Sequence, residues 1–555
     1  MFHSMKDVFD RYLNGLSRRE LFRRGGMLSA LPALLGASRP ASAATPVTGG
    51  RLQLGPDIYK SIGVRPLINC RGTLTVISGS LELPEVRAAQ DAAAQHFVQL
   101  DELMEGIGQR LAELTGAEWG MVSSGCAAGL AHATTACVTG GNPDLHVRVP
   151  DLTGFPKDEV VIPKTSRNEY DQAIRSVGVR VIEVGDAAEY EAALGPKVAM
   201  VYVFAGPRSE SGPLTYDAIY GIAKKKKVPV LVDAAAEMLT IPNVHLQRGA
   251  TLVGYSGGKC IRGPQCAGIL LGRKDLVKAA WMSSAPHHGH GRTMKLGKEE
   301  AIGMLAAVEM WVKRDHKAEM ETWISWLNNI AGRVSKIDGV KTAVREPRGL
   351  SNHSPGLSII WDPAKLGITG EEVSNILYTT EPRIALGGGG GGGGGRGNRT
   401  SNETGISITA YMMSPGEDKI VGDRIHQILS ASRPPWKPET PKNPAADLTG
   451  RWDVRIDFVA GSAEHTFHVK QQGNQLLGTH QGDFVARDFS GAISGNEVRI
   501  SSSVGEVHGA ALSYRFTGKL EGDKMSGALD MGEYLDAKWT ATRHSFGRAQ
   551  ASDVG

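Results

Sequence analysis

The sequence predicts an α/β protein with a mostly parallel sheet, a smaller α+β unit after it, and an added antiparallel β domain at the C-terminal end. Three observations predict this. Short β-branched runs alternate with helical stretches over residues 52–315, a mixed pattern follows over 316–432, and two-residue alternation begins after residue 446. A chain of 555 residues with 41% hydrophobic and 22% charged residues is expected to form several globular domains.

Residues 1–43 predict an export signal. The stretch Ser17–Arg23 resembles the twin-arginine motif, an apolar segment follows over Gly25–Ala37, and Ala41–Ala43 resembles a small-residue cleavage site. A surface amphipathic helix with incidental arginines is the alternative. We expect the twin-arginine export machinery as a partner and a periplasmic or secreted product. Because this route moves folded proteins, it suggests a tightly held cofactor.

Charge and composition narrow the functional classes. The formal net charge is +4, but residues 1–43 hold seven Lys/Arg and three Asp/Glu, so the rest holds 55 of each. A chain without overall basic bias is not expected to bind nucleic acid tightly. No run of 18 apolar residues occurs, so we expect no membrane span in the mature form. Five cysteines in this length exclude a disulfide scaffold.

The large α/β unit, residues 52–315, is predicted from short apolar runs of the kind that form buried parallel strands. The runs are Val160–Ile162, Val179–Ile182, Ala199–Phe204 and Val228–Val232, and a helical stretch covers Tyr216–Lys227.

The segments after residue 315 are read in order along the chain. Residues 316–432 predict a small α+β unit with a helix over 323–334, strands at 357–360 and 405–410, and a low-complexity glycine loop at Gly387–Gly395. Five prolines make residues 433–446 a stiff linker. Residues 447–545 alternate apolar and polar side chains between turn signals. They predict about eight antiparallel strands in a barrel or sandwich that serves as an accessory or oligomerisation module.

The strongest chemical signal is an aspartate at a strand end followed by a lysine among glycines. Asp233 ends a buried run, and Lys259 follows 26 residues later inside the stretch Ser256–Gln265. Pyridoxal phosphate needs such a pair: the lysine forms a Schiff base with the aldehyde, and the aspartate keeps the pyridine nitrogen protonated. Ser256 and the glycines allow close approach to the cofactor. Taken alone, Lys259 could be an ordinary surface lysine and Asp233 an ordinary turn residue. Together they predict a pyridoxal phosphate site.

A second element suits a phosphate group. The loop Ser123–Gly129 precedes a helical run over 130–138, and amides at a helix N-terminus bind anions. We assign Ser124, Gly125 and Cys126 to the phosphate cup, with a plain helix cap as the alternative.

Four stretches resemble the selenocysteine-synthase-like family of pyridoxal-phosphate enzymes of fold type I: residues 101–129, 166–174, 256–265 and 291–300. This family includes L-seryl-tRNA selenium transferase and the D-glucosaminate-6-phosphate ammonia-lyase-like enzymes, and the match, over about residues 55–430, is denser toward the second branch. The resemblance implies a dimer or higher homo-oligomer with shared active sites, Lys259 as the Schiff-base lysine and Asp233 as the partner of the pyridine nitrogen. The chain departs from the family in its export signal, its glycine run, its added β domain and the lack of a tRNA-binding N-terminal domain.

Weaker candidates concern the substrate. Arg167 and Tyr170 are expected to contact a substrate carboxylate or the cofactor, with a helix-face arginine and a core tyrosine as the alternative. Arg262 is expected to reach a phosphate across a subunit boundary or to form a structural ion pair. Arg292 follows three histidines in a loop that we interpret as a substrate loop. No acidic or cysteine ligand of metal spacing accompanies these histidines, so we expect no metal.

These residues predict α,β-elimination on a small amino acid or amino sugar acid, with Lys259 as general base at Cα and ammonia as a product. The alternatives are β-replacement, including selenium or sulfur transfer, and racemisation, because the pocket selects the bond that breaks. An exported binding protein without catalysis is the alternative from another class.

Overall fold

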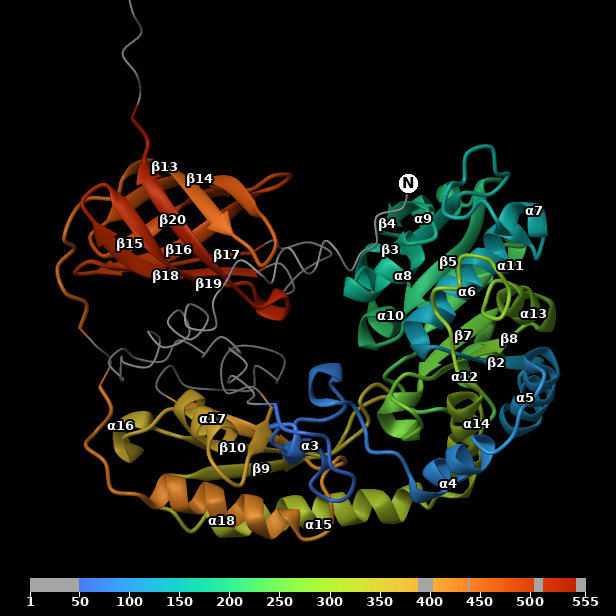
Figure 1. The fold of residues 1–555 in the computed structure, drawn as a ribbon, viewed down its shortest axis with the longest axis horizontal. Coiled ribbons are helices and arrows are strands. Elements are labelled where there is room, and N and C mark those ends of the chain that lie inside the picture. The colour runs from blue at the N-terminus through green and yellow to red at the C-terminus, as the bar shows by residue number, and fades with distance from the viewer. Residues whose placement is uncertain (1–48, 388–402, 438–439, 504–512, 546–555) are drawn as a thin grey trace, which may run out of the picture. The chain divides into compact units, whose positions relative to one another are not determined.

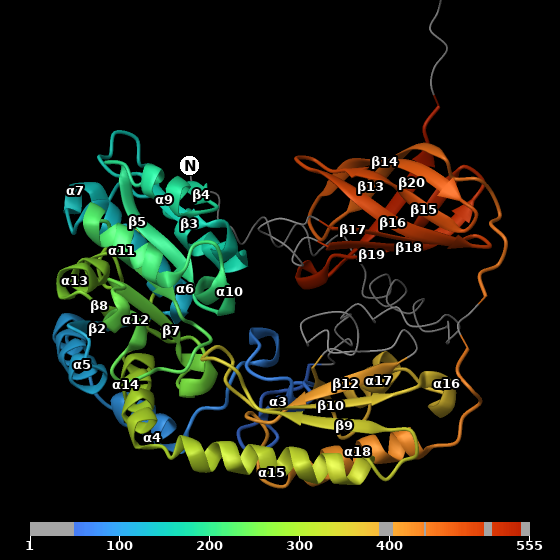
Figure 2. The same cartoon turned by 180° about the vertical axis from the view of Figure 1, so that it is seen from behind.

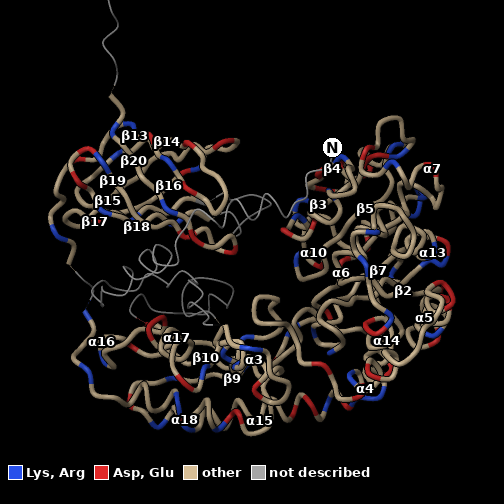
Figure 3. Tube along the Cα trace, in the orientation of Figure 1, with Lys and Arg blue, Asp and Glu red and all other residues tan. Residues whose placement is uncertain are grey.

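The computed structural model describes residues 49–387, 403–437, 440–503 and 513–545 (Figure 1). The predicted signal peptide and the glycine run after Gly387 lie outside the described residues. Within them, no helix has the length and apolarity needed to cross a membrane. Figure 3 shows acidic and basic residues interspersed along the Cα trace of the described chain.

The large α/β unit is built on a seven-stranded sheet in the order β2-β8-β7-β6-β5-β3-β4 (Figure 2). All neighbouring pairs are parallel except those of β8, which is antiparallel to both neighbours. Several strands are buried along their whole length, as expected when helices cover both faces of a sheet. The strands are β2 (Trp119–Ser123), β3 (Glu159–Pro163), β4 (Arg180–Val184), β5 (Val198–Phe204), β6 (Val230–Asp233), β7 (Leu252–Ser256) and β8 (Gly268–Gly272).

The helices around this sheet, all except α10, share one hydrophobic cluster with it. They are α4 (Pro84–Ala93), α5 (Leu100–Thr115), α6 (Gly125–Thr139), α7 (Pro143–His146), α8 (Gln172–Arg175), α9 (Ala187–Ala193), α10 (Pro207–Ser211), α11 (Tyr216–Lys226), α12 (Val244–Arg248), α13 (Lys274–Met282) and α14 (Lys298–Lys313). The short helix α3 (Ile58–Ser61) precedes them.

The four predicted strand runs correspond to β3, β4, β5 and β6, and the predicted helix at 216–227 is α11. The phosphate-cup helix differs from its prediction: α6 begins at Gly125 rather than near residue 130. The reason is Gly125 itself, whose φ of +83° turns the chain sharply from β2 into the helix.

The small unit contains an antiparallel sheet in the order β12-β10-β9 and its own hydrophobic cluster. Its elements are α15 (His316–Val334), β9 (Lys341–Arg345), β10 (Gly356–Trp361), α16 (Pro363–Leu366), α17 (Gly370–Thr379), β11 (Ile384–Leu386), β12 (Thr404–Thr409) and α18 (Glu417–Ser430). The strand β1 (Ile68–Cys70) pairs with β11 in parallel, and Cys70 is buried in the small unit's cluster. The strand β1 falls before residue 315, in the predicted large unit, but it packs with the small unit.

The C-terminal domain is a closed antiparallel barrel, which selects between the predicted barrel and sandwich. Closure is visible in the pairing of β13 with both β14 and β20. Glycines inside the strands allow the tight approach: a Cβ at Gly527 would lie 1.9 Å from the carbonyl oxygen of Thr517. The strands are β13 (Gly450–Asp457), β14 (Ser462–Gln472), β15 (Gln475–Gln481), β16 (Ala486–Ser494), β17 (Glu497–Ser503), β18 (Ser513–Glu521), β19 (Lys524–Asp530) and β20 (Asp536–Arg543).

Candidate active site

Asp233 and Lys259 line one cavity of about 830 Å³. Asp233 is the last residue of β6, and Lys259 follows β7, the parallel neighbour of β6. Because the carboxyl ends of parallel strands meet at one edge of a sheet, both side chains come to the same place. The pairing on which the sequence prediction depended is therefore present.

The carboxyl group of Asp233 is buried and surrounded by neutral donors. The side chain is 2% exposed. Tyr202 donates its hydroxyl to Oδ2 at 2.9 Å, and the amide of Ala235 donates to Oδ1 at 3.1 Å. The thiol of Cys126 lies 3.7 Å from Oδ1. Burial raises the pKa of Asp233, although these hydrogen bonds and the charge of Lys259 oppose the rise. A buried carboxylate with this surrounding suits a cationic ring nitrogen.

Lys259 sits in a π-helical turn, η4 (Gly257–Ile261), whose shape depends on glycine. A Cβ at Gly258 would lie 2.8 Å from the Cα of Gln265, and one at Gly257 would lie 2.7 Å from the carbonyl oxygen of Ala267. The backbone of Lys259 leaves helical geometry, with φ −123° and ψ −135°. Only glycine at these two positions allows the turn to approach the segment that contains Gln265 and Ala267 so closely.

Arg314 fixes the same turn from behind. It donates Nη1 to the carbonyl oxygen of Cys260 at 3.1 Å, and its Nε and Nη2 bind both carboxylate oxygens of Glu319 at 2.8 Å. The side chain of Arg314 is 8% exposed. Burial alone raises the pKa of Glu319, but hydrogen bonds from His316 and Arg314 outweigh it and lower the pKa to about 2. The peptide next to Lys259 is thus held by a charged, bidentate pair.

The start of α6 borders the cavity through Gly125, Cys126 and Ala127. Ser124 is the N-cap residue and is not among the lining residues, so the structure brings two of the three predicted phosphate-cup residues to the cavity. A Cβ at Gly268 would lie 2.6 Å from the amide nitrogen of Cys126, so a glycine in β8 admits the helix start. The 15-residue helix α6 presents the unpaired amides and the positive dipole end of its N-terminus here.

The predicted substrate residues are distributed over different places. Tyr170 lines the cavity, as do Ser256 and Lys259. Arg167 does not: its guanidinium binds Asp171 at 2.6 Å and also Glu183. This matches the structural alternative for Arg167. Arg292 is exposed and is not among the residues that line the cavity.

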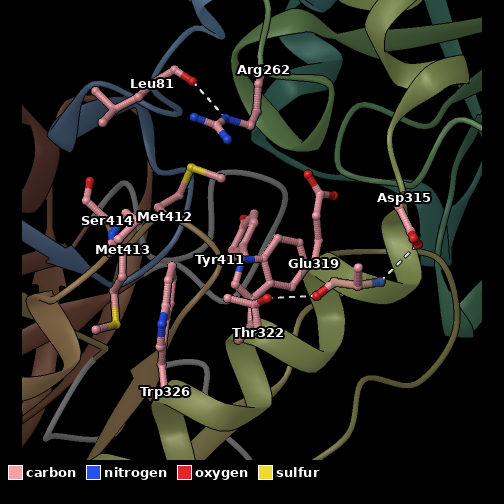
Figure 4. A pocket seen from close by; sticks show the side chains of 13 residues that line it. Leu81, Arg262, Asp315, Glu319, Thr322, Trp326, Tyr411, Met412, Met413 and Ser414 are labelled. Carbon is pink, nitrogen blue, oxygen red and sulfur yellow. Dashed lines mark hydrogen bonds between the residues drawn. The ribbon is translucent and has the colours of Figure 1, made fainter.

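Arg262 borders a neighbouring pocket of about 470 Å³ rather than the cavity of Lys259 (Figure 4). Its Nε donates to the carbonyl oxygen of Leu81 at 3.0 Å. Tyr411 lines both pockets, and its hydroxyl lies 2.8 Å from Oγ1 of Thr73, another residue of the larger cavity. The predicted reach of Arg262 to a phosphate across a subunit boundary stays a prediction.

Three functional candidates were missed by reading the sequence. Tyr202 lies in β5, next to β6, and was read only as part of a strand. Arg71 and Arg345 line the cavity from segments far from Lys259 in sequence. No sequence motif marked them, because only the fold brings these segments together. Two arginines in the lining of the cavity suit an acidic substrate.

These residues fit pyridoxal phosphate. Lys259 would hold the aldehyde carbon, Asp233 would hold the protonated pyridine nitrogen, and the amides at the start of α6 would hold the phosphate. The fit rests on a buried carboxylate whose described hydrogen-bond partners are neutral donors, and on a helix start open to the same cavity. Within the described residues, no group of three or more metal-ligating side chains occurs.

The chain is similar to three characterised proteins. It is 32% identical to D-glucosaminate-6-phosphate ammonia lyase of Salmonella typhimurium, over 52% of this chain and 79% of that protein. It is 31% identical to 5'-C-glycyluridine monooxygenase-decarboxylase of a Streptomyces species, over 59% and 83%. It is 23% identical to L-seryl-tRNA(Sec) selenium transferase of Proteus mirabilis, over 46% and 58%.

A solved structure of D-glucosaminate-6-phosphate ammonia-lyase superposes with a TM-score of 0.59 at 28% identity, covering 68% of this chain and 99% of that one. About a third of this chain therefore lies outside that superposition. No family model matches the chain. Two of these relatives are more than 30% identical to this chain, and each is covered over more than two thirds of its length. The chain belongs to the selenocysteine-synthase-like family of fold type I, whose cofactor is pyridoxal phosphate, and is a pyridoxal-phosphate-dependent lyase or transferase.

Proposed function

We propose that the protein is an exported lyase that removes the β-hydroxyl group and the amino group from a small 2-amino-3-hydroxy acid or amino sugar acid. One observation carries this proposal: Lys259, Asp233 and Arg345 line a single cavity in a chain similar to an ammonia lyase over 79% of that enzyme. The products are a 2-oxo acid and ammonia. The water lost at the β-carbon is balanced by the water that later releases ammonia.

The residues of the cavity have separate tasks in this reaction. Bound pyridoxal phosphate withdraws electrons from the substrate's Cα. Lys259 takes the proton from Cα with its Nζ, and Asp233 keeps a positive charge at the ring nitrogen. Tyr202 and the amide of Ala235 hold the Asp233 carboxylate in place by hydrogen bonds. Arg345, at the end of β9, is suited to bind the substrate carboxylate.

The test is a panel of 2-amino-3-hydroxy acids offered to the holoenzyme. The panel holds both enantiomers of serine and threonine, and glucosaminate with and without a 6-phosphate. We expect equal amounts of ammonia and 2-oxo acid from at least one member. Lys259→Ala should abolish both products, and Lys336→Ala, at an exposed lysine, should abolish neither. A product that keeps its nitrogen would favour β-replacement or racemisation over elimination.

A second candidate reaction follows from the similarity to a monooxygenase-decarboxylase over 83% of its length. In that case the substrate loses its carboxyl group as carbon dioxide and dioxygen is consumed. An oxygen electrode and a carbon dioxide assay on the same panel separate the two reactions. Oxygen uptake in proportion to product would reject elimination.

We also propose that residues 1–43 direct the chain through the twin-arginine route to the periplasm or the medium. Support comes from the order of arginine pair, apolar stretch and small-residue site in the sequence. Replacing Arg18 and Arg19 together by lysine should retain the protein in the cytoplasm. Equal amounts of both versions in the periplasmic fraction would contradict this.

A homo-oligomer is the third part of the proposal. The large apolar side chains of Val76, Leu81 and Phe97 are exposed, which is costly for a monomer. Light scattering should give a dimer or a higher state, and Phe97→Asp should shift it toward the monomer. A wild-type monomer at micromolar concentration would contradict this part alone.

A further inference from the structure

One end of the barrel is polar inside. The strands of a barrel alternate inward and outward side chains, and the inward ones at this end are not apolar. They come from five successive strands, β14 to β18: His465, His480, Arg487, Ser502 and Tyr514. The other inward positions form the apolar core around Phe467, Phe516 and Trp539. This end is therefore built differently from the rest of the interior.

Two histidines and a serine form a hydrogen-bonded chain there. His480 is fully buried, with Nδ1 2.7 Å from Oγ of Ser502 and Nε2 2.8 Å from Nδ1 of His465. Burial lowers the pKa of His480 to about 3, and burial also lowers that of His465. Both imidazoles are consequently neutral near pH 7. The carboxylate of Asp483 lies 3.9 Å from Nε2 of His465, at the outer end of the chain.

Arg487 supplies the charge at this end. Its Nε and Nη1 are buried and have no hydrogen-bond partner in the described chain. The guanidinium lies 4.7 Å over the ring of Tyr514. A Cβ at Gly482 would come within 3.1 Å of Nη1, so a glycine leaves room beside it. Buried charged donors without an acceptor are costly, and a bound anion is a common explanation.

The loops at the same end carry apolar side chains on the outside. The three described loops are 458–461, 482–485 and 531–535, and each follows a strand that ends here. Val459 is 90% exposed and Phe484 97% exposed, and Leu535 is also exposed. Because the barrel is an up-and-down antiparallel one, these loops lie at the same end as Arg487, whereas the connection between β17 and β18 at this end, residues 504–512, lies outside the described residues. We call this end of the barrel, with its three described loops, the mouth.

We propose that this mouth binds a small organic carboxylate with an apolar body, such as a medium-chain aliphatic acid. One guanidinium at the same end as two neutral imidazoles suits a monoanion better than a phosphate dianion. The apolar loops suit the body of the ligand, and the mouths of small barrels are a recurrent place for one small ligand. The proposal is independent of the reaction at Lys259.

The experiment is calorimetric titration of the full-length holo protein with octanoate. We expect saturable 1:1 binding at this end, and 1-octanol, which has the same chain without the charge, should bind at least tenfold more weakly. Arg487→Gln should weaken octanoate binding at least tenfold, because it removes a charged donor. Arg455→Gln is the matched control: Arg455 lies on β13, is half-exposed and pairs with Asp457 and Glu464.

A second variant guards against misfolding of the first. Phe484 is exposed, so Phe484→Ser should leave the barrel folded, by circular dichroism, and weaken octanoate binding several-fold. Octanoate that binds Arg487→Gln as tightly as the wild type would overturn the proposal, as would equal affinity for octanol. Binding to phosphatidylglycerol vesicles without binding of free octanoate would also overturn it and assign the loops to a membrane surface.

Discussion

The cavity of Asp233 and the polar mouth of the barrel each bury one charged side chain, and they satisfy it in opposite ways. Asp233 accepts hydrogen bonds from Tyr202 and Ala235, so its carboxylate is held in place before any ligand arrives. Arg487 keeps two buried nitrogens that have no acceptor within the part of the chain that the structure describes. The first arrangement orients the carboxylate toward the ring nitrogen of the cofactor, whereas the second leaves two guanidinium nitrogens without a hydrogen-bond acceptor among the described residues.

The largest expected effect is at Lys259. Lys259→Ala removes both the amine that holds the cofactor and the base at Cα, so turnover should fall at least about 10³-fold. Borohydride treatment of the wild type should add the mass of the reduced cofactor to the peptide with Lys259. Lys336→Ala should keep both the activity and the mass shift. Mass added to another lysine in the wild type would separate the cofactor site from this cavity.

The next effect tests the carboxylate of Asp233. Asp233→Asn keeps the shape and removes the charge that retains the proton on the ring nitrogen, so turnover should fall by about 10²-fold or more while the cofactor still binds. Steady-state rates and the absorption spectrum of the bound cofactor measure both. An unchanged rate would place the partner of the nitrogen elsewhere.

Asp233→Asn lowers the turnover of the holoenzyme, but it is expected to raise the stability of the apoprotein. Burial raises the folded-state pKa of Asp233 above its unfolded value, so the folded apoprotein holds this proton more tightly. Stability from this group is present at low pH and is lost as pH rises through the raised pKa. Apo Asp233→Asn should therefore melt at a higher temperature than apo wild type above that pH.

A moderate effect is expected at the pair of Arg314 and Glu319, which holds the turn that carries Lys259. The folded-state pKa of Glu319, about 2, lies below its unfolded value of about 4.3. The stability it contributes is therefore complete above about pH 5 and is lost as pH falls toward 2. Glu319→Gln should flatten this acid limb in urea unfolding and should speed cofactor release about tenfold, because Arg314 then holds Cys260 less firmly. An acid limb identical to that of the wild type would contradict the role of this pair.

The smallest effect belongs to the barrel. Since Nε and Nη1 of Arg487 have no acceptor among the described residues, Arg487→Met should leave the melting temperature unchanged or raise it by a few degrees. Arg543, whose guanidinium binds Asp523 and two backbone carbonyls, provides the contrast. Arg543→Met should lower the melting temperature. A loss at Arg487 as large as that at Arg543 would show that Arg487 has a structural partner.

How much of each site could be predicted from the sequence depends on how its residues are spaced along the chain. Asp233 and Lys259 belong to neighbouring strands of a regular α/β pattern, so a strand-end rule was enough to bring them together. Arg345 reaches the same cavity from a strand of the small unit, and no local pattern marks it. The barrel was predicted from alternation, but its closure depends on the pairing of β13 with β20, far apart in the sequence.

Arg167 shows where local reading was incomplete. Its acidic partner Asp171 is four residues later, at the spacing that pairs side chains on one helix face, and Glu183 completes the pair. The motif that suggested a substrate contact therefore contained its own counter-charge. The positive φ of Gly125, by contrast, could not be predicted, because the sequence shows only that a glycine is present there.

The pairing of β1 with β11 sets an order on how the chain acquires its fold. Ile68 meets Ile384, so the first strand waits for more than three hundred residues of synthesis before its neighbour exists. Ring closure over such a span is slow compared with the formation of local helices. Until then Cys70, which ends up fully buried, has no core to enter. The pairing of β1 with β11 therefore forms only after residues 384–386 have been synthesised, and any chaperone or export factor that meets the growing chain before then meets β1 without its partner strand.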